Sequence, residues 1–432
     1  MKQKLTLFFA FFMLLAASCG KLNPNPEITI KNEMKLDNTV SRFGTTLKID
    51  LDANFDYGVQ IEESAMSWVG VLQADRSLLS LRIESNSDTV ERETEVKLTS
   101  ENGVVVSIRI YQNCAEPVLI YPAPQNEGFH RMMYIPSYRG VDAASIPDEY
   151  LKMFDVVAYA FARLNDDLSV TIENPTKVST LVSRCKALGV KLVISFAGNS
   201  SAFKAMTSTG KGRTKFVNDI MRIVDHYKLD GVDNDWEFPS TASNTADPNM
   251  FLMRQFSNIL HAPGENKLLM MAVITGMWQS TREGIRPGVF DCVDWLNIMS
   301  YNYITSKDTP ETYNAMYVLT NAAENWCGTA KLPKNKFVGG LPLYATNNQS
   351  PTVNLAYKTV LSKGGDPDKD AAVLDYNGKK MPFFYDGKVT IKKKVEWLMD
   401  QGMGGYFFWE SSYDTYGEHS LIRTAYDAWR NH

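Results

Sequence analysis

The sequence of 432 residues predicts an α/β protein, a (β/α)8 TIM barrel with a small all-β sandwich domain in front of it. From residue 130 onward, eight apolar segments rich in β-forming residues recur, and most of them precede a helical pattern. Strands that alternate with helices are parallel strands joined by crossovers, and eight of them close a barrel. Before residue 115, short apolar runs alternate with polar residues, as in strands that bury one face. A doubly wound open sheet is the alternative for the larger domain.

The composition limits the classes of function. Hydrophobic residues make up 44% and charged residues 22% of the chain, as in an ordinary globular protein. The net charge of -4 and the isoelectric point near 5.9 indicate no basic surface for nucleic acid and disfavour acidic polymers as partners. The five cysteines lack CxxC spacing and the five histidines lack a pair at metal-ligand spacing, so we expect neither a metal nor a cofactor.

Residues 1–18 have the pattern of a secretory signal peptide. Two lysines precede an apolar run from Leu5 to Ala17, which is too short to span a membrane as a helix. The end of this run, Ala16-Ala17-Ser18-Cys19, resembles a bacterial lipoprotein box, which implies that Cys19 becomes a lipidated N-terminus and that residues 19–26 form a tether. We therefore expect a protein that crosses the inner membrane and is anchored by lipid to the outer membrane or cell surface. Cleavage that leaves Cys19 unmodified is the alternative.

Residues 27–114 predict the small β-sandwich. Every second residue from Val104 to Ile110 is apolar, and Asn102-Gly103 is a strong hairpin turn signal. Four residues in this strand-rich frame resemble those of the BACON domains of bacterial surface proteins, namely Trp68, Asn86, Arg92 and Gln112. The resemblance implies either a module that binds carbohydrate or mucin, or a spacer that holds the rest of the chain away from a membrane.

Residues 115–129 contain three prolines and predict a stiff linker to the large domain, residues 130–432. The eight predicted strands of that domain begin near Arg131, Asp155, Lys191, Gly231, Leu269, Trp295, Phe337 and Gly404. Three of the stretches between them keep an apolar stripe at the period of an α-helix, within 178–188, 216–227 and 391–399, and Gly189 ends the first of these.

The most informative segment is Leu229–Pro239, at the end of the fourth predicted strand. Because side chains alternate between the faces of a strand, Asp233, Asp235 and Glu237 point to the same side. Crowded carboxylates cannot all ionise at low cost, so at least one pKa should rise toward the range in which a carboxylic acid donates a proton at neutral pH. The carboxyl ends of the strands form the active-site face of such a barrel. The segment therefore predicts acid catalysis.

Two other interpretations of such an acidic cluster are a solvated loop and a cation site. Four apolar residues interleave with the acids and disfavour a loop, namely Leu229, Val232, Trp236 and Phe238. A calcium loop needs more oxygen ligands and a glycine at its own spacing, and the segment has neither. Catalysis is therefore the preferred interpretation.

The acidic segment also resembles a known family. Asp230-Gly-Val-Asp233-Asn-Asp235-Trp-Glu237 is similar to the DGxDxDxE signature of glycoside hydrolase family 18, the chitinase family. Three further segments resemble motifs of that family, namely Ser195-Phe-Ala-Gly198 on the third strand, Met299-Ser-Tyr301-Asn302 on the sixth, and Gly404-Gly405-Tyr-Phe-Phe-Trp409-Glu on the eighth. The resemblance covers His130 to the C-terminus.

The resemblance implies a retaining, substrate-assisted mechanism in which the acetamido oxygen of the substrate is the nucleophile. Glu237 would be the acid that protonates the leaving oxygen. Asp235 would orient and polarise the acetamide, Asp233 would share a proton with Asp235, and Tyr301 would donate a hydrogen bond to the acetamido carbonyl. Trp409 would form the hydrophobic floor beneath the sugar. Further substrate contacts are expected from Tyr134, Phe161, Met299, Asn302 and Tyr344, and a structural role from Asp230, Gly231 and Ser195.

The sequence departs from the family at three places. Asn302 stands where most chitinases carry Asp, which removes a charge and is expected to change the pH optimum or the rate. Ala197 replaces a usual Gly and adds a methyl group beside the site. Residues 344–404, between strands seven and eight, leave little room for the additional α+β domain of many processive chitinases. We expect a remnant of it near Tyr376–Asp386, and a shallow, open cleft.

Three functions follow from the resemblance. The first is a monomeric surface glycosidase that cleaves β-1,4 linkages after N-acetylglucosamine in chitin, chito-oligosaccharides or similar chains. The second is an endo-β-N-acetylglucosaminidase that cuts the chitobiose core of N-glycans, which the chitinase-like context of Trp236 and Phe238-Pro239 makes the weaker choice. The third is a non-catalytic glycan-binding lipoprotein, although such members of the family usually lose the glutamate that Glu237 retains here.

Overall fold

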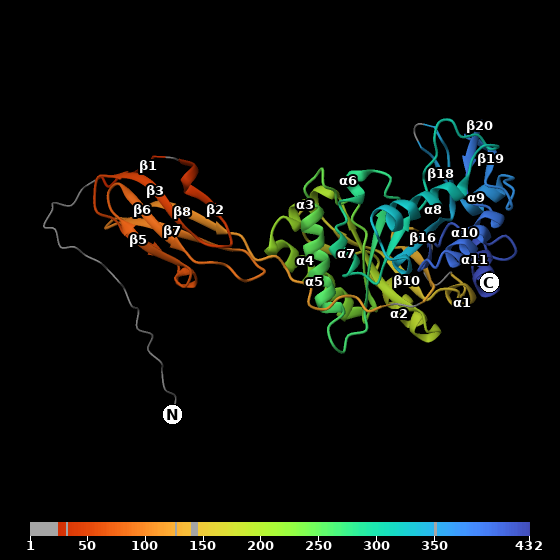
Figure 1. Ribbon diagram of the computed structural model, residues 1–432, viewed down its shortest axis with the longest axis horizontal. Coiled ribbons are helices and arrows are strands. Elements are labelled where there is room, and N and C mark those ends of the chain that lie inside the picture. The colour runs from red at the N-terminus through yellow and green to blue at the C-terminus, as the bar shows by residue number, and fades with distance from the viewer. Residues whose placement is uncertain (1–24, 32, 126–127, 140–145, 350–351) are drawn as a thin grey trace, which may run out of the picture. The chain divides into compact units, whose positions relative to one another are not determined.

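The computed structural model describes residues 25–31, 33–125, 128–139, 146–349 and 352–432 (Figure 1). The chain divides into two compact units, Met1–Glu116 and Pro117–His432, which are described separately below. The predicted signal peptide 1–18, the predicted lipidation site Cys19 and most of the tether 19–26 lie outside the described residues. Among the residues that are described, none of the helices is long and apolar enough to cross a membrane.

The first unit is a β-sandwich of two four-stranded sheets. One sheet has the strand order β1 (Ile28–Ile30), β3 (Thr45–Ala53), β6 (Leu78–Ile83) and β5 (Val69–Ala74). The other sheet has the order β2 (Asp37–Val40), β8 (Gly103–Gln112), β7 (Arg92–Ser100) and β4 (Gly58–Ile61). Two short 3-10 helices, η1 (Glu33–Leu36) and η2 (Glu63–Ala65), lie between strands. The alternation predicted for this region is confirmed, because Val96, Ile108 and Ile110 are buried while the residues on either side of them are partly or fully exposed. The hairpin from β7 to β8 turns where Ser100 pairs with Gly103.

Three of the four residues behind the BACON resemblance contact one another. The Arg92 guanidinium lies over the Trp68 ring at 4.5 Å, and its Nε donates a hydrogen bond to Gln112 Oε1 at 2.9 Å. Gln112 in turn donates to the carbonyls of Ser41, at 3.0 Å, and Glu84, at 2.8 Å. These contacts join the ends of β2, β6 and β8, so the residues serve the packing of the sandwich. The BACON resemblance itself stays a prediction.

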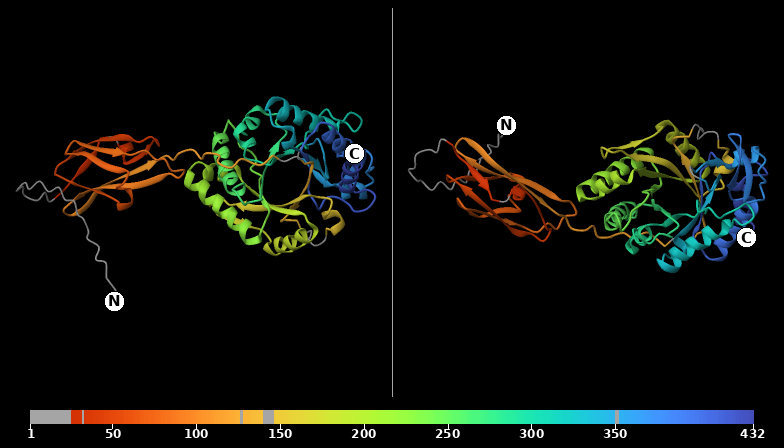
Figure 2. Two further views of the ribbon diagram at one scale, coloured as in Figure 1. Left: turned by 60° about the horizontal axis from the view of Figure 1, so that its bottom comes forward. Right: turned by 90° about the horizontal axis from the view of Figure 1, so that it is seen from above.

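The second unit contains the closed barrel (Figure 2). Its eight parallel strands are, in order around the barrel, β9 (His130–Pro136), β10 (Val156–Leu164), β12 (Lys191–Gly198), β13 (Gly231–Asn234), β14 (Leu268–Ile274), β15 (Trp295–Met299), β16 (Phe337–Pro342) and β21 (Gly405–Trp409). Because β9 pairs with both β10 and β21, the sheet closes, which confirms the predicted barrel and excludes the open sheet. A short strand, β11 (Val170–Ile172), pairs antiparallel with the end of β10.

Helices surround the barrel, as the left view of Figure 2 shows. The α-helices are α1 (Asp148–Leu151), α2 (Pro175–Leu188), α3 (Ser200–Thr207), α4 (Gly210–Tyr227), α5 (Ala246–Leu260), α6 (Gln279–Arg282), α7 (Pro287–Phe290), α8 (Ala315–Ala323), α10 (Lys388–Asp400) and α11 (Leu421–Arg430). Helix α8 continues into the π-helical segment η4 (Glu324–Thr329), which is followed by the 3-10 helix η5 (Lys334–Lys336). The three predicted apolar stripes lie on α2, α4 and α10 and face the strands. Gly189 ends α2 with a φ of +71°, a conformation that glycine adopts at little cost.

Two glycines allow adjacent strands to approach closely. A Cβ atom on Gly231 would lie 2.2 Å from the carbonyl oxygen of Leu268, and one on Gly405 would lie 2.0 Å from that of His130. Neither strand could keep its place with a side chain at these positions. The structural role predicted for Gly231 therefore has a direct cause, which is the packing of the strand that carries the acids.

An α+β insertion between β16 and α10 is larger than predicted. It contains β17 (Tyr344–Thr346), β18 (Asn354–Ala356), α9 (Tyr357–Ser362), β19 (Ala371–Tyr376) and β20 (Lys379–Phe384), and its four strands form one antiparallel sheet (Figure 1). The sequence predicted only a remnant near Tyr376–Asp386. Two of the strands have three residues each, which is too short for alternation of apolar and polar positions to be recognised.

The first part of the predicted linker 115–129 is bound to the barrel unit. Asn258 of α5 accepts hydrogen bonds from the backbone N–H groups of Ile120, at 2.6 Å, and Tyr121, at 3.1 Å, and donates to the carbonyl of Val118 at 2.8 Å. Ser257 donates to the carbonyl of Tyr121 at 2.7 Å. We call residues 117–123 the strap.

Candidate active site

The three acids of the central segment lie at increasing distance from the barrel interior. Asp233 belongs to β13 and its side chain is completely buried, Asp235 follows the end of that strand with 7% exposure, and Glu237 is exposed at the mouth of the barrel. The intervening Asn234 points the other way, because its Nδ2 donates to Asn249 Oδ1 on α5 at 3.2 Å. The strand ends at Asn234, before Asp235 and Glu237, but the charges of Glu237 and Asp233 both act on Asp235, so the three carboxyl groups lie close together.

Asp233 is held by hydrogen bonds from three other strands. Its Oδ2 accepts from Ser195 Oγ at 2.7 Å and from the Tyr134 hydroxyl at 2.9 Å, and its Oδ1 accepts from Asn297 Nδ2 at 3.0 Å. Burial raises the pKa of Asp233 to about 6, although the three hydrogen bonds act in the opposite direction. The pKa of Asp233 therefore lies closer to neutral pH than that of an exposed aspartate.

Asn297 is a site residue that the sequence reasoning missed. It lies in β15, donates to both Asp233 and the Tyr134 hydroxyl, and is itself oriented by Trp295, whose Nε1 donates to Asn297 Oδ1 at 3.0 Å. The signal was present in the sequence, since an asparagine at an inward position of the apolar strand Trp-Leu-Asn-Ile-Met needs buried hydrogen-bond partners.

Asp235 carries the unsatisfied polar atom of the site. Within the part of the chain that the structure describes, its buried Oδ1 has no hydrogen-bond partner. Burial raises the pKa of Asp235 well above its usual value, and the neighbouring charges of Glu237 and Asp233 raise it further. A buried carboxyl group with a free oxygen beneath the mouth of the barrel is suited to hold the polar group of a ligand.

Glu237 is the outermost acid. Although the side chain is exposed, desolvation by the surrounding wall raises its pKa above the usual value. A larger fraction of Glu237 is therefore protonated at mildly acidic to neutral pH than for an isolated glutamate. The side chain combines access for a ligand with the ability to donate a proton.

Tyr301 and Asn302 follow the end of β15. The Tyr301 ring packs against Phe407 and Tyr344, with ring centroids 6.1 Å apart in both cases, and Gly340 makes room for it, since a Cβ there would lie 2.7 Å from the ring. Burial raises the pKa of Tyr301 well above its usual value, so its hydroxyl remains a hydrogen-bond donor. Asn302 Oδ1 accepts a hydrogen bond from the Tyr344 hydroxyl at 2.5 Å.

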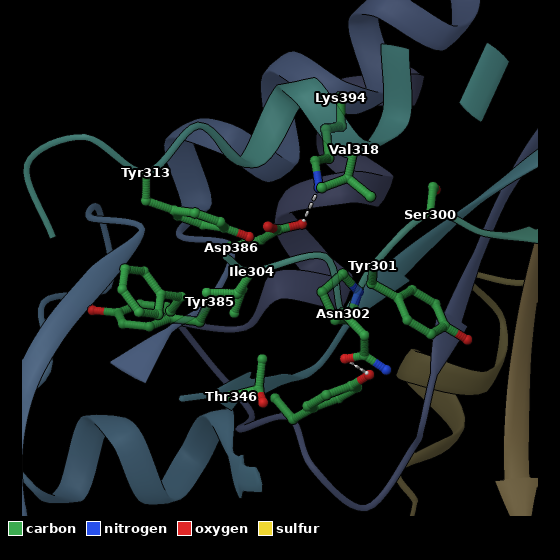
Figure 3. Close-up of a pocket in the computed structure, with 13 residues that line it drawn as sticks. Ser300, Tyr301, Asn302, Ile304, Tyr313, Val318, Thr346, Tyr385, Asp386 and Lys394 are labelled. Carbon is green, nitrogen blue, oxygen red and sulfur yellow. Dashed lines mark hydrogen bonds and ion pairs between the residues drawn. The ribbon is translucent and has the colours of Figure 1, made fainter. Parts of the chain in front are cut away.

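These residues border a pocket that continues toward the insertion (Figure 3). Figure 3 shows the Asp386 carboxylate with the Lys394 ammonium on one side and Tyr313 on the other. Lys394 Nζ donates to Asp386 Oδ2 at 2.6 Å, and both side chains are 2% exposed. The predicted substrate contacts Tyr344 and Asn302 thus lie on the wall of this pocket, while Met299 is half-buried at the end of β15.

Aromatic rings form a stack at the ends of β21, β9 and β10. Trp409, at the end of β21, is half-buried, and its ring lies 6.0 Å from Phe161 and 5.4 Å from Tyr134 between centroids. Tyr134 is only 2% exposed and donates to Asp233, so it lies beneath the site rather than on its surface. Tyr138, which the sequence reasoning missed, is 43% exposed and stacks on Phe161 at 6.4 Å with nearly parallel rings.

The remaining motif residues are Asp230 and Ala197. Asp230 Oδ2 accepts a hydrogen bond from the backbone N–H of Leu192 at 2.7 Å, so it ties the beginning of β13 to β12. Ala197 lies in the barrel interior next to the site. Among the described residues, no group of three or more His, Cys, Asp or Glu side chains is arranged to hold a metal ion.

Comparison with known proteins agrees with this geometry. The model of the family described as glycosyl hydrolases family 18 matches residues 130–414. Nod factor hydrolase protein 1 of Medicago truncatula is 25% identical over 329 residues, which are 64% of this chain and 85% of that protein. Class V chitinase CHIT5 of Lotus japonicus is 22% identical over 376 residues, which are 76% of this chain and 92% of that protein.

Solved structures share the fold. The GH18 chitinase ChiB from the chitin utilization locus of Flavobacterium johnsoniae aligns with a TM-score of 0.58 at 20% identity and covers 71% of this chain and 95% of that one. The chitinase-like agglutinin RobpsCRA from Robinia pseudoacacia aligns with a TM-score of 0.57 at 22% identity and covers 69% of this chain and 99% of that one. Since the family model matches more than half of the chain, from the first barrel strand to the segment after the last, the chain belongs to the glycosyl hydrolases family 18 and is a glycosidase.

Proposed function

We propose that the protein hydrolyses β-1,4 linkages after N-acetylglucosamine in chitin oligosaccharides or similar chains, with retention and with help from the substrate's own acetamide. This proposal rests on the differences in burial among the three acids. Glu237 is exposed and has a raised pKa, whereas Asp235 is buried and its Oδ1 atom has no hydrogen-bond partner among the described residues. This arrangement supplies one accessible proton donor and one fixed carboxyl group, which is what a substrate-assisted reaction requires.

In the proposed first step, Glu237 gives its proton to the glycosidic oxygen as the bond to the anomeric carbon breaks. The acetamido oxygen of the same sugar attacks that carbon from the other side. Asp235 accepts a hydrogen bond from the acetamide N–H through the oxygen that has no protein partner, and Tyr301 donates to the acetamido carbonyl. The resulting cyclic ion carries the positive charge beside Asp235.

In the second step, the Glu237 carboxylate takes a proton from a water molecule that attacks the anomeric carbon, and the acetamide is restored. Asp233 and Asp235 share a proton during the cycle, because two adjacent buried carboxyl groups cannot both ionise at low cost. The hydrogen bonds from Ser195, Tyr134 and Asn297 keep Asp233 fixed while its charge changes. Trp409 forms the apolar floor under the sugar.

The names of related proteins support a substrate that contains N-acetylglucosamine. The relatives include chitinases and a Nod factor hydrolase, and one of the similar structures is a class V chitinase from Cycas revoluta in complex with (GlcNAc)3. Similarity to an agglutinin keeps glycan binding without hydrolysis as the second candidate. The presence of Glu237 favours the enzyme.

The test is to incubate the purified protein with chitotetraose and with a high-mannose glycoprotein, and to identify products by mass spectrometry. We expect cleavage of chitotetraose. Cleavage of the glycoprotein alone would indicate the endo-β-N-acetylglucosaminidase instead, and glycan binding without any cleavage would indicate the lectin.

Replacing the proposed acid gives the second arm of this test. Glu237→Gln should lower kcat by roughly 100-fold to 10000-fold, the range that a general acid contributes, while chitotetraose binding persists. The matched control is Glu265→Gln, which changes a surface glutamate paired with Lys267. Equal activity of the two variants would contradict the assignment of Glu237.

A further inference from the structure

Arg163 lies on the inner face of β10, at the carboxyl end where the active site opens. The pairing of β10 with β12 shifts register at Phe161, after which Arg163 stands beside Ala197. Side-by-side residues of adjacent parallel strands point to the same face, and Ala197 belongs to the barrel interior. Arg163 is close enough to the acids for its charge to lower the pKa of Asp235. Its guanidinium is therefore directed toward the mouth of the barrel.

A second arginine, Arg139, also lies close to the Tyr138 ring. The Arg163 Cζ atom is 5.0 Å from the centroid of the Phe161 ring and 5.8 Å from that of Tyr138, and the Arg139 Cζ atom is 5.2 Å from the Tyr138 ring. Tyr138 extends the ring stack outward from Trp409 through Phe161. A sugar chain leaving the Trp409 floor along this stack meets both guanidinium groups.

The acids near the two arginines neutralise them only in part. Arg163 Nε lies 3.6 Å from Glu173 Oε1, and Arg139 Nε lies 3.5 Å from Glu410 Oε1. Both Glu410 oxygens already accept hydrogen bonds from Ser412, and Arg139 also donates to the Tyr413 hydroxyl. A guanidinium carries five N–H donors, so donors remain on each arginine for an acceptor on a ligand.

We propose that Arg139, Arg163 and Tyr138 bind an acidic substituent, a carboxylate or a sulfate ester, on a sugar next to the one held by Trp409. This inference rests on the proposed function and defines the substrate more closely, as an N-acetylhexosamine chain that carries acidic groups. Two arginines flanking an aromatic ring match such a sugar, because the ring packs on its apolar face while the guanidinium groups bind the anion. The net charge of -4 argues against long polyanions over the whole surface, whereas this site accommodates single anions.

The experiment compares kcat/KM for three tetrasaccharides with the wild-type protein. They are neutral chitotetraose, an alternating tetrasaccharide of N-acetylglucosamine and N-acetylmuramic acid, and chitotetraose bearing 6-O-sulfate. We expect at least one acidic substrate to be preferred over the neutral one. The muramic acid and sulfate arms distinguish the source of the anion.

Arginine variants then test the site itself. In Arg139→Gln and Arg163→Gln, the ratio of acidic to neutral kcat/KM should fall about 10-fold, as expected for the loss of a charge-assisted hydrogen bond. Arg163→Lys should retain part of the preference, because it keeps the charge. The control is Arg222→Gln, on the exposed face of α4, which should leave the ratio unchanged. Thermal unfolding of each variant confirms that it folds.

An unchanged ratio in both arginine variants would overturn the inference, as would a wild-type preference for the neutral substrate. If the wild-type protein cleaves none of the three, the proposed function fails separately. In that case, Kd values for the same saccharides are measured by calorimetry. The inference then predicts that the wild-type protein binds an acidic saccharide more tightly than the neutral one and that Arg163→Gln reduces this preference.

Discussion

Three carboxyl groups within five residues of one another have raised pKa values, although their surroundings differ. Asp233 is saturated with hydrogen bonds, Asp235 is buried with one oxygen free, and Glu237 reaches solvent. In the proposed mechanism, these differences in burial and hydrogen bonding give the three acids the separate roles of proton store, acetamide holder and acid.

Asn302 gives a prediction about pH dependence. The Tyr344 hydroxyl donates a hydrogen bond to Asn302. Tyr344 is also close enough to Glu237 for the negative charge of Glu237 to raise the pKa of Tyr344. In Asn302→Asp, a new negative charge should disfavour ionisation of Glu237 and Asp235 and raise their pKa values further. Because Glu237 must be protonated to act as the acid, the alkaline limb of the kcat/KM profile should move to higher pH.

The measurement is a pH profile of chitotetraose cleavage for the wild-type protein, Asn302→Asp and Asn302→Ala. The alanine variant removes the group that accepts the Tyr344 hydrogen bond and adds no charge. The alkaline limb of its kcat/KM profile should therefore not move to higher pH. A shift to lower pH in Asn302→Asp would contradict the electrostatic argument.

At the scale of elements, the sequence predicted what repeats and missed what is short or solitary. The eight barrel strands were predicted from apolar segments that recur along the chain, and the helices α2, α4 and α10 from apolar stripes at the period of a helix. The three-residue strands β17 and β18 have none, so the insertion was underestimated. Likewise the acids were recognisable by their alternation, whereas Asn297 and Tyr138 each stand alone, and their importance arises only from partners that are distant in sequence.

The ion pair between Asp386 and Lys394 gives a prediction about α10 and the insertion. In Lys394→Met, the buried Asp386 loses its partner, which should destabilise the barrel unit by about 3–5 kcal/mol. The control on the same helix is Lys392→Met, because Lys392 is 61% exposed and its pairing with Glu396 at 3.7 Å is worth at most about 1 kcal/mol. Urea unfolding followed by tryptophan fluorescence measures both, and equal destabilisation of the two variants would contradict a structural role for the buried pair.

At the scale of the whole molecule, the two units have separate hydrophobic cores. One core lies between the two sheets of the sandwich, whereas the barrel unit has a core between the barrel strands and their helices and another inside the barrel. Calorimetry of the full chain should therefore resolve changes in one unit from changes in the other. The strap, residues 117–123, lies within the segment predicted as a stiff linker, and hydrogen bonds to α5 hold it on the barrel unit.

The strap yields the last prediction. Asn258→Ala removes three hydrogen bonds, to Val118, Ile120 and Tyr121. Because each hydrogen bond contributes about 1 kcal/mol net, the substitution should destabilise the barrel unit by about 1–3 kcal/mol. In a calorimetric scan of the full chain, the barrel transition should move down by a few degrees while the sandwich transition stays in place, since none of these bonds involves the first unit. Asn218→Ala, on the exposed face of neighbouring α4, is the matched control and should move neither. If Asn258→Ala leaves the barrel transition in place, the strap does not stabilise the barrel; if both transitions move together, the strap couples the two units instead of belonging to one.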